Sequence, residues 1–194
     1  MMFLIAGLAL FLGVHSVEIF LPQVKSLAVT RIGTNAWKGI FSLVAIAGFV
    51  LICIGYGEAR LSSPVWLYQP PKALRQAAFL LMLPVFPLLL AAYLPGRIRT
   101  RAKHPMLLAT KLWALAHLLA NGGLHDTLLF GSFLIWAVAD RISVKHRTVV
   151  SSPPPSAPAS RWNDLVVLLG GLTLYLLFVA VFHKLLIGVS PNVG

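Results

Sequence analysis

GIFSLVAIAGFVLICIGY, residues 39–56, is a run of eighteen residues without a charged side chain. A transmembrane helix needs about 20 consecutive apolar residues, because the hydrocarbon core of a bilayer is about 30 Å thick. The run is continuous and does not alternate between apolar and polar residues, so it does not fit the strands of a transmembrane barrel. It therefore predicts a helix that crosses a membrane.

Similar apolar runs recur along the chain and predict six transmembrane helices, over residues 3–21, 39–56, 77–94, 106–120, 124–139 and 165–187. Of the 194 residues, 58% are apolar and 11% are charged, whereas a soluble domain has about 25% charged residues. We therefore predict an all-α polytopic membrane helix bundle. The first run lacks a basic segment ahead of it and contains His15 and Glu18, so we interpret it as a helix of the mature protein and not as a signal peptide.

The lysines and arginines between the runs predict the orientation, because cytoplasmic loops retain positive charge. With an outside N-terminus, eleven of them are cytoplasmic, whereas three, or four with Lys184, are not. The cytoplasmic set is Lys25, Arg31, Lys38, Arg97, Arg99, Arg101, Lys103, Arg141, Lys145, Arg147 and Arg161. Both termini are then expected outside. Topology and anionic lipid account for the net charge of +11, so we expect a lipid bilayer and no nucleic acid as partner.

A low-complexity segment, SSPPPSAPAS at residues 151–160, predicts an extended linker. We expect a five-helix membrane body over 1–147, a Pro/Ser-rich cytoplasmic linker over 148–164, and a sixth helix with a short tail over 165–194. Cys53 is the single cysteine, which excludes an intramolecular disulfide and a cysteine-based metal site.

Two histidines fall inside predicted spans, where an ionisable side chain is a functional hypothesis by default. His15 shares a helical face with Glu18, and His117 shares one with Asn121. The plain interpretation is that both imidazoles hydrogen-bond across helix interfaces. The sharper interpretation is haem ligation, because a b-type haem can take two axial histidines from different helices of a bundle.

Haem ligation makes a further demand, since the second ring nitrogen of each ligand needs a hydrogen-bond acceptor. Glu18 or Asn121 could supply it. No Cys-x-x-Cys-His sequence occurs, which excludes covalent c-type attachment.

Two other histidine positions have simpler interpretations. His104 stands before Pro105 at the start of the fourth predicted helix, where an imidazole is ordinarily solvated or bound to lipid headgroups. His125 and Asp126 begin the fifth predicted helix, and we expect Asp126 to cap its positive end.

The chain resembles a known family over nearly its whole length. Four stretches show the resemblance: GLALFLGVHS at 7–16, HPMLLATKLWALAHLLANG at 104–122, LLFGSFLIW at 128–136 and HKLLIGVSP at 183–191. They resemble the NnrU family of bacterial membrane proteins. The resemblance implies a multi-pass protein of the bacterial inner membrane. The family name comes from a member linked to nitrite and nitric oxide reduction, and a plant relative is the 15-cis-zeta-carotene isomerase, a membrane enzyme that uses b-type haem.

The resemblance to that isomerase places the two haem ligands on His15 and His117. We rank His15 with His117 first as the ligand pair for haem b, and His15 with His104 second. The isomerase has a cysteine three residues before its second histidine, proposed as a redox-dependent alternative ligand. Ala114 stands at that position here, which puts the isomerase activity in doubt.

The function expected from these features is a haem-binding sensor or accessory factor of nitrite and nitric oxide metabolism (denitrification). Its partners would be nitrogen-oxide reductase components or a lipophilic substrate. One alternative is a haem-dependent isomerase of the carotene type. A second is a membrane methyltransferase, because Lys103-His104-Pro105 resembles the R-H-P opening of the isoprenylcysteine carboxyl methyltransferase site. The acidic and aromatic motif that follows in that group is missing here.

Overall fold

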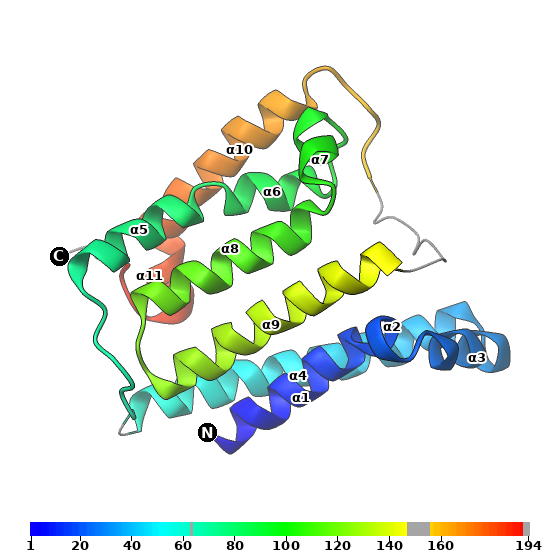
Figure 1. The fold of residues 1–194 in the computed structure, drawn as a ribbon, viewed down its shortest axis with the longest axis horizontal. Coiled ribbons are helices and arrows are strands. Elements are labelled where there is room, and N and C mark those ends of the chain that lie inside the picture. Colours follow the sequence, from blue (N-terminus) through cyan, green and yellow to red (C-terminus); the bar gives the residue numbers. More distant parts are fainter. Residues whose placement is uncertain (63, 147–155, 192–194) are drawn as a thin grey trace. The chain divides into compact units, whose positions relative to one another are not determined.

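The computed structural model describes residues 1–62, 64–146 and 156–191, and every regular element in these ranges is helical. The elements are α1 (Met2–His15), α2 (Val17–Phe20), α3 (Pro22–Ile32), α4 (Thr34–Leu61), α5 (Lys72–Met82), α6 (Val85–Ala91), α7 (Arg97–Ala102), α8 (Pro105–Ala120), α9 (Leu124–His146), α10 (Asn163–Leu177), the π-helix η1 (Phe178–Phe182) and α11 (His183–Ile187) (Figure 1). The predicted all-α fold is confirmed.

Among the described residues, four helical segments are long and apolar enough to cross a membrane: Thr34–Leu61, Lys72–Ala91, Leu124–His146 and Asn163–Ile187. Their mean hydropathy lies between 1.5 and 2.7. The other two predicted spans correspond to the shorter apolar helices α1 and α8, of 14 and 16 residues. The chain is thus a protein with membrane-spanning helices, and the count of six and the outside position of both termini stay predictions.

Two of the predicted spans contain breaks. The first ends as an α-helix at His15 and continues as the single turn α2 after Ser16. The third is divided between α5 and α6 at Leu83 and Pro84, because a proline ring lacks an N–H and clashes with the preceding helical turn. Hydropathy alone shows neither break.

Contacts divide the described chain into two compact units. Unit 1 comprises residues 1–69 and 122–146, with helices α1–α4 and α9. Unit 2 comprises residues 70–121 and the described part of 147–194, with helices α5–α8, α10, η1 and α11.

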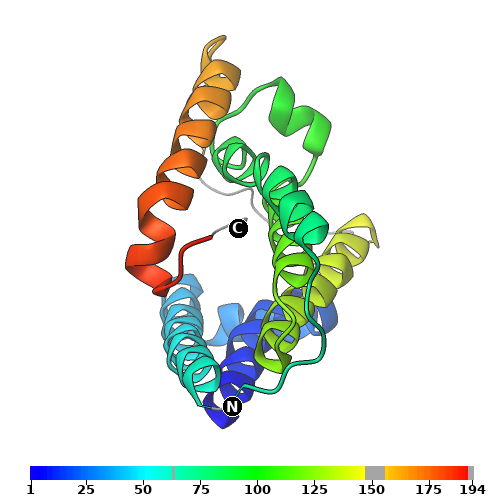
Figure 2. The same ribbon diagram turned by 90° about the vertical axis from the view of Figure 1, so that its left-hand side faces the viewer.

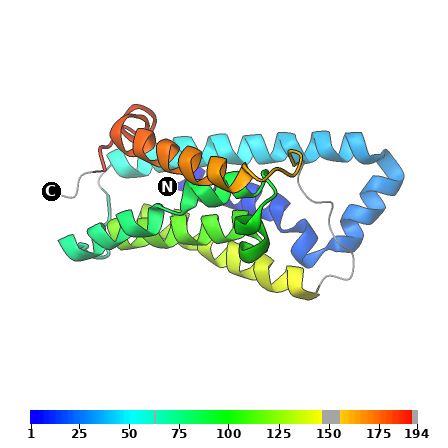
Figure 3. The same ribbon diagram turned by 90° about the horizontal axis from the view of Figure 1, so that it is seen from above.

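In unit 1, α1 and α4 approach closely at glycines. A Cβ on Gly48 would lie 2.7 Å from the backbone nitrogen of Phe11, and one on Gly55 would overlap the backbone of Leu4. Gly7, on α1, faces the α4 backbone in the same way. Small residues allow helices in a membrane to gain van der Waals contact. In Figure 3, α3 forms the bend that leads from α1 and α2 to the long α4.

In unit 2, the last long helix packs against α6. A Cβ on Gly171 would lie 2.5 Å from the backbone nitrogen of Pro87, and the hydroxyl of Tyr175 donates to the carbonyl of Phe79 at 3.1 Å. Figure 2 shows α10 continuing through η1 into α11, in orange to red. These contacts pack the sixth predicted helix against α5 and α6 of the same unit.

The three predicted domains, 1–147, 148–164 and 165–194, stay a prediction. Residues 148–155 of the predicted linker, and residue 147 before them, lie outside the described residues. Residues 156–160 have no regular secondary structure, and the N–H of Ala157 donates to the carbonyl of Tyr93 at 2.9 Å.

The close approach of α1 and α4 predicts different outcomes for two glycines of one helix. Gly55→Ala should lower the free energy of unfolding by about 1–3 kcal/mol, because the added methyl overpacks the contact with Leu4. Gly57 has no atom within 4 Å of an added Cβ, so Gly57→Ala should be neutral or stabilising by up to about 1 kcal/mol. Denaturant unfolding in detergent measures both, and equal effects would contradict this packing.

Candidate functional site

His15 is the last residue of α1, and its ring is held by its own helix. Its Nδ1 lies 2.6 Å from the carbonyl oxygen of Phe11, one turn earlier. Since a carbonyl oxygen only accepts, Nδ1 must carry the proton. A neutral imidazole then has its lone pair on Nε2, which has no hydrogen-bond partner in the described part of the chain.

Aromatic rings surround the His15 imidazole on several sides. Phe11 stacks on it with ring centroids 4.3 Å apart, Phe41 meets it edge-on at 5.0 Å, and Trp136 of α9 does so at 6.0 Å. The ring is half-buried. These contacts limit its rotation and reduce the access of water to it.

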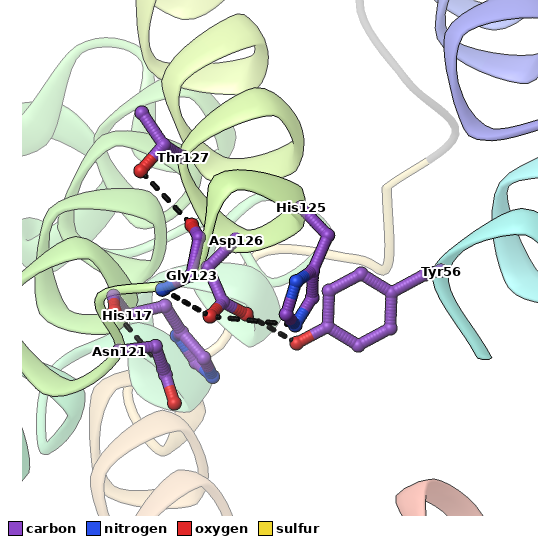
Figure 4. Close-up of polar contacts among 7 residues, drawn as sticks. All are labelled: Tyr56, His117, Asn121, Gly123, His125, Asp126 and Thr127. Atoms are coloured by element: carbon purple, nitrogen blue, oxygen red, sulfur yellow. Dashed lines mark hydrogen bonds and ion pairs between the residues drawn. The ribbon is translucent and has the colours of Figure 1, made fainter. Parts of the chain in front are cut away.

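His117 repeats the local arrangement in the last turn of α8. Its Nδ1 lies 2.8 Å from the carbonyl oxygen of Trp113, again one turn earlier. The side-chain amide of Asn121 donates to the carbonyl of His117 at 2.9 Å (Figure 4). Both candidate ligands therefore use Nδ1 to donate within their own helix.

The acceptors differ from those that we predicted from sequence. The Nδ1 acceptors are backbone carbonyls, and not the side chains of Glu18 or Asn121. Glu18 instead forms an ion pair with Lys25 of α3, and Asn121 caps the end of α8. The reason is local, because a histidine inside a helix reaches the carbonyl four residues earlier without any partner from another element.

His104 occupies a different kind of position. It precedes Pro105 at the N-terminus of α8 and follows Lys103, whose φ of 59° reverses the chain after α7. The ring is half-buried. It lies thirteen residues before His117 on the same helix.

The three predicted ligands are distributed over both units. His15 belongs to unit 1, whereas His104 and His117 belong to unit 2. The pairings of His15 with His117 and of His15 with His104 therefore stay predictions. Within the residues that the structure describes, no group of three or more His, Cys, Asp or Glu side chains could hold a metal ion, and a haem iron requires only two protein ligands.

The structure adds a buried polar cluster of Tyr56, His125 and Asp126 in unit 1 (Figure 4). The Tyr56 hydroxyl donates to Oδ1 of Asp126 at 2.6 Å, and the N–H of Gly123 donates to Oδ2 at 3.0 Å. The His125 Nε2 lies 3.6 Å from the same Oδ2. The side chains of His125 and Asp126 are 3% and 4% exposed.

The predicted capping role of Asp126 is confirmed by its bond from Gly123. Its contact with Tyr56 joins residues 70 positions apart, and no local pattern of the sequence indicates it. Leu67 also contacts the turn between α8 and α9. Its N–H donates to the carbonyl of Gly122 at 2.8 Å. The cluster thus joins α4 to the start of α9.

The comparisons with known proteins agree with the sequence resemblance. The family model described as NnrU protein matches residues 3–191. This range includes His15, His104 and His117. No curated protein and no solved structure matches the chain.

The Tyr56–Asp126 bond predicts a selective effect of removing one hydroxyl. Tyr56→Phe should lower the free energy of unfolding by about 1–3 kcal/mol, because a buried carboxylate loses a donor. Tyr93 is 46% exposed and its hydroxyl has no partner among the described residues, so Tyr93→Phe should change stability by less than about 0.5 kcal/mol. Equal effects in detergent unfolding experiments would contradict a stabilising role of the cluster.

Proposed function

The chain belongs to the NnrU family, and on this basis we propose that it is a haem b-binding membrane protein with His15 and His117 as the axial ligands. The observation that supports the proposal is the matching state of the two rings. Each donates Nδ1–H to the carbonyl four residues earlier, at 2.6 Å and 2.8 Å. Metal-bound histidines in proteins usually make this kind of second bond.

The chain's own residues would orient the ligands and exclude water. The carbonyls of Phe11 and Trp113 fix the tautomer of the two imidazoles. Phe11, Phe41 and Trp136 enclose the His15 ring in apolar surroundings. A haem bound there would supply a one-electron redox centre whose potential depends on its ligands and on burial.

Two histidine ligands leave no open position on the iron, and this favours electron transfer or sensing over catalysis. We therefore infer a role as sensor or accessory factor in nitrite and nitric oxide metabolism, in the inner membrane of a bacterium. The isomerase alternative has less support. At the position that resembles the isomerase's cysteine, Ala114 is fully buried and its methyl group cannot bind iron.

Absorption spectra test the proposal. The detergent-purified protein should show a Soret band and, after reduction with dithionite, sharp α and β bands. His15→Ala and His117→Ala should each lose this signature, because each removes one axial ligand. His146 is exposed at the end of α9, and His146→Ala is the matched control that should keep the spectrum.

A spectrum that survives His117→Ala but is lost in His104→Ala would identify the second-ranked pair. Folded wild-type protein that takes up no haem from an excess would contradict the proposal. The two histidines would then be groups that stabilise their own helices.

A further inference from the structure

Helix α7 is short, basic and largely exposed. It contains Arg97, Arg99 and Arg101, and Lys103 follows it directly. No salt bridge to any of these four side chains occurs among the described residues. Asp164 attracts the guanidinium groups of Arg97 and Arg101 without forming a salt bridge, and the remaining excess of positive charge is available to an anion from outside the chain.

The N-terminus of α7 is already occupied by a carboxylate of the same unit. Oδ2 of Asp164 accepts from the N–H of Arg97 at 2.9 Å, and Oδ1 accepts from the N–H of Ile98 at 3.0 Å. Gly96 allows this approach, because a Cβ there would overlap the carboxylate. Both carboxylate oxygens are committed to backbone N–H groups, so an external anion must be bound by side chains.

The same contacts bring the start of α10 beside the start of α7. Asn163 donates its side-chain amide to the carbonyl of Pro95 at 2.8 Å, next to the Asp164 bonds. Arg161 and Trp162 immediately precede this point. The guanidinium of Arg161 lies 5.1 Å from the centre of the Trp162 ring. The surface around this contact in unit 2 thus carries Arg97, Arg101 and Arg161, whereas Arg99 falls on another face of α7.

The position of this surface along the chain indicates its depth in the membrane. Arg161 and Trp162 precede Asn163–Ile187, the most apolar of the candidate spans. Trp162 is 56% exposed. Exposed tryptophans at the ends of spans favour the headgroup level of a bilayer, where apolar and polar surroundings meet. Arg97, Arg101 and Arg161 are therefore expected beside lipid phosphates.

We propose that Arg97, Arg101 and Arg161, with Trp162, form a binding site for the phosphate headgroup of an anionic diacyl phospholipid. Arg97 and Arg101 are four residues apart and share one face of α7. Guanidinium groups bind phosphate oxygens in pairs, which makes arginine better suited than lysine to this contact. The exposed Trp162 and the apolar helix behind it accommodate acyl chains, which a free phosphate lacks.

Native mass spectrometry in neutral detergent tests this site, with phosphatidylglycerol as probe and phosphatidylcholine as reference. The wild type should retain phosphatidylglycerol in preference to phosphatidylcholine. The triple variant Arg97→Gln, Arg101→Gln, Arg161→Gln should weaken this binding at least about tenfold. The matched control Arg31→Gln, Lys38→Gln, Arg141→Gln removes the same charge elsewhere and should bind as the wild type does.

Four results would overturn the proposal. Equal loss in the control would indicate diffuse attraction to charge. Equal binding of phosphatidylcholine would exclude recognition of an anion, and displacement by equimolar glycerol phosphate would identify a site for free phosphate. If the triple glutamine variant does not fold, the variant Arg97→Lys, Arg101→Lys, Arg161→Lys replaces it. It should bind more weakly than the wild type, and unchanged binding would equally overturn the proposal.

This site does not depend on haem. The haem spectrum should be the same in the triple variant and in the wild type. Failure of one proposal is therefore distinguishable from failure of the other.

Discussion

Hydrocarbon offers no hydrogen bonds, so each polar group that enters it must find its partner within the chain. Most of the polar geometry described above follows from this constraint. His15 and His117 each use a carbonyl of their own helix, and Asp126 collects donors from Tyr56 and Gly123. Each candidate ligand makes its Nδ1 hydrogen bond within its own helix. The Asp126 carboxylate instead accepts hydrogen bonds from two separate parts of the chain. The first arrangement leaves Nε2 of His15 without a partner among the described residues, and the second stabilises the fold.

The helices were predictable because hydropathy is a local property. Each predicted span has a helical counterpart, and the joint between α8 and α9 lies at residues 121–123, as the glycines there indicate. The breaks at Ser16 and Pro84 were missed, because an apolar run does not show where backbone bonding changes. The π-helix η1 lies in another uninterrupted apolar run and leaves no mark on hydropathy either.

The candidate site was likewise predictable only where the local sequence determines it. Helical spacing drew attention to His15 and His117, and their role as haem ligands stays a prediction. The spacing did not indicate that backbone carbonyls accept from both rings, or that Glu18 pairs with Lys25, because the turn into α3 depends on tertiary structure. The Tyr56–Asp126 bond joins distant residues. A pairing of His15 with a histidine of α8 likewise depends on how whole units pack, which no single helix encodes.

The division of unit 1 into two separate stretches of sequence has a consequence for biosynthesis. Residues 1–69 leave the ribosome first, but α9 is made only after residues 70–121. Helices α1 and α4 can already pair through their glycines at that stage, while Tyr56 still lacks its carboxylate partner. Unit 1 therefore stays incomplete while residues 70–121 are made, and the arrival of α9 completes it.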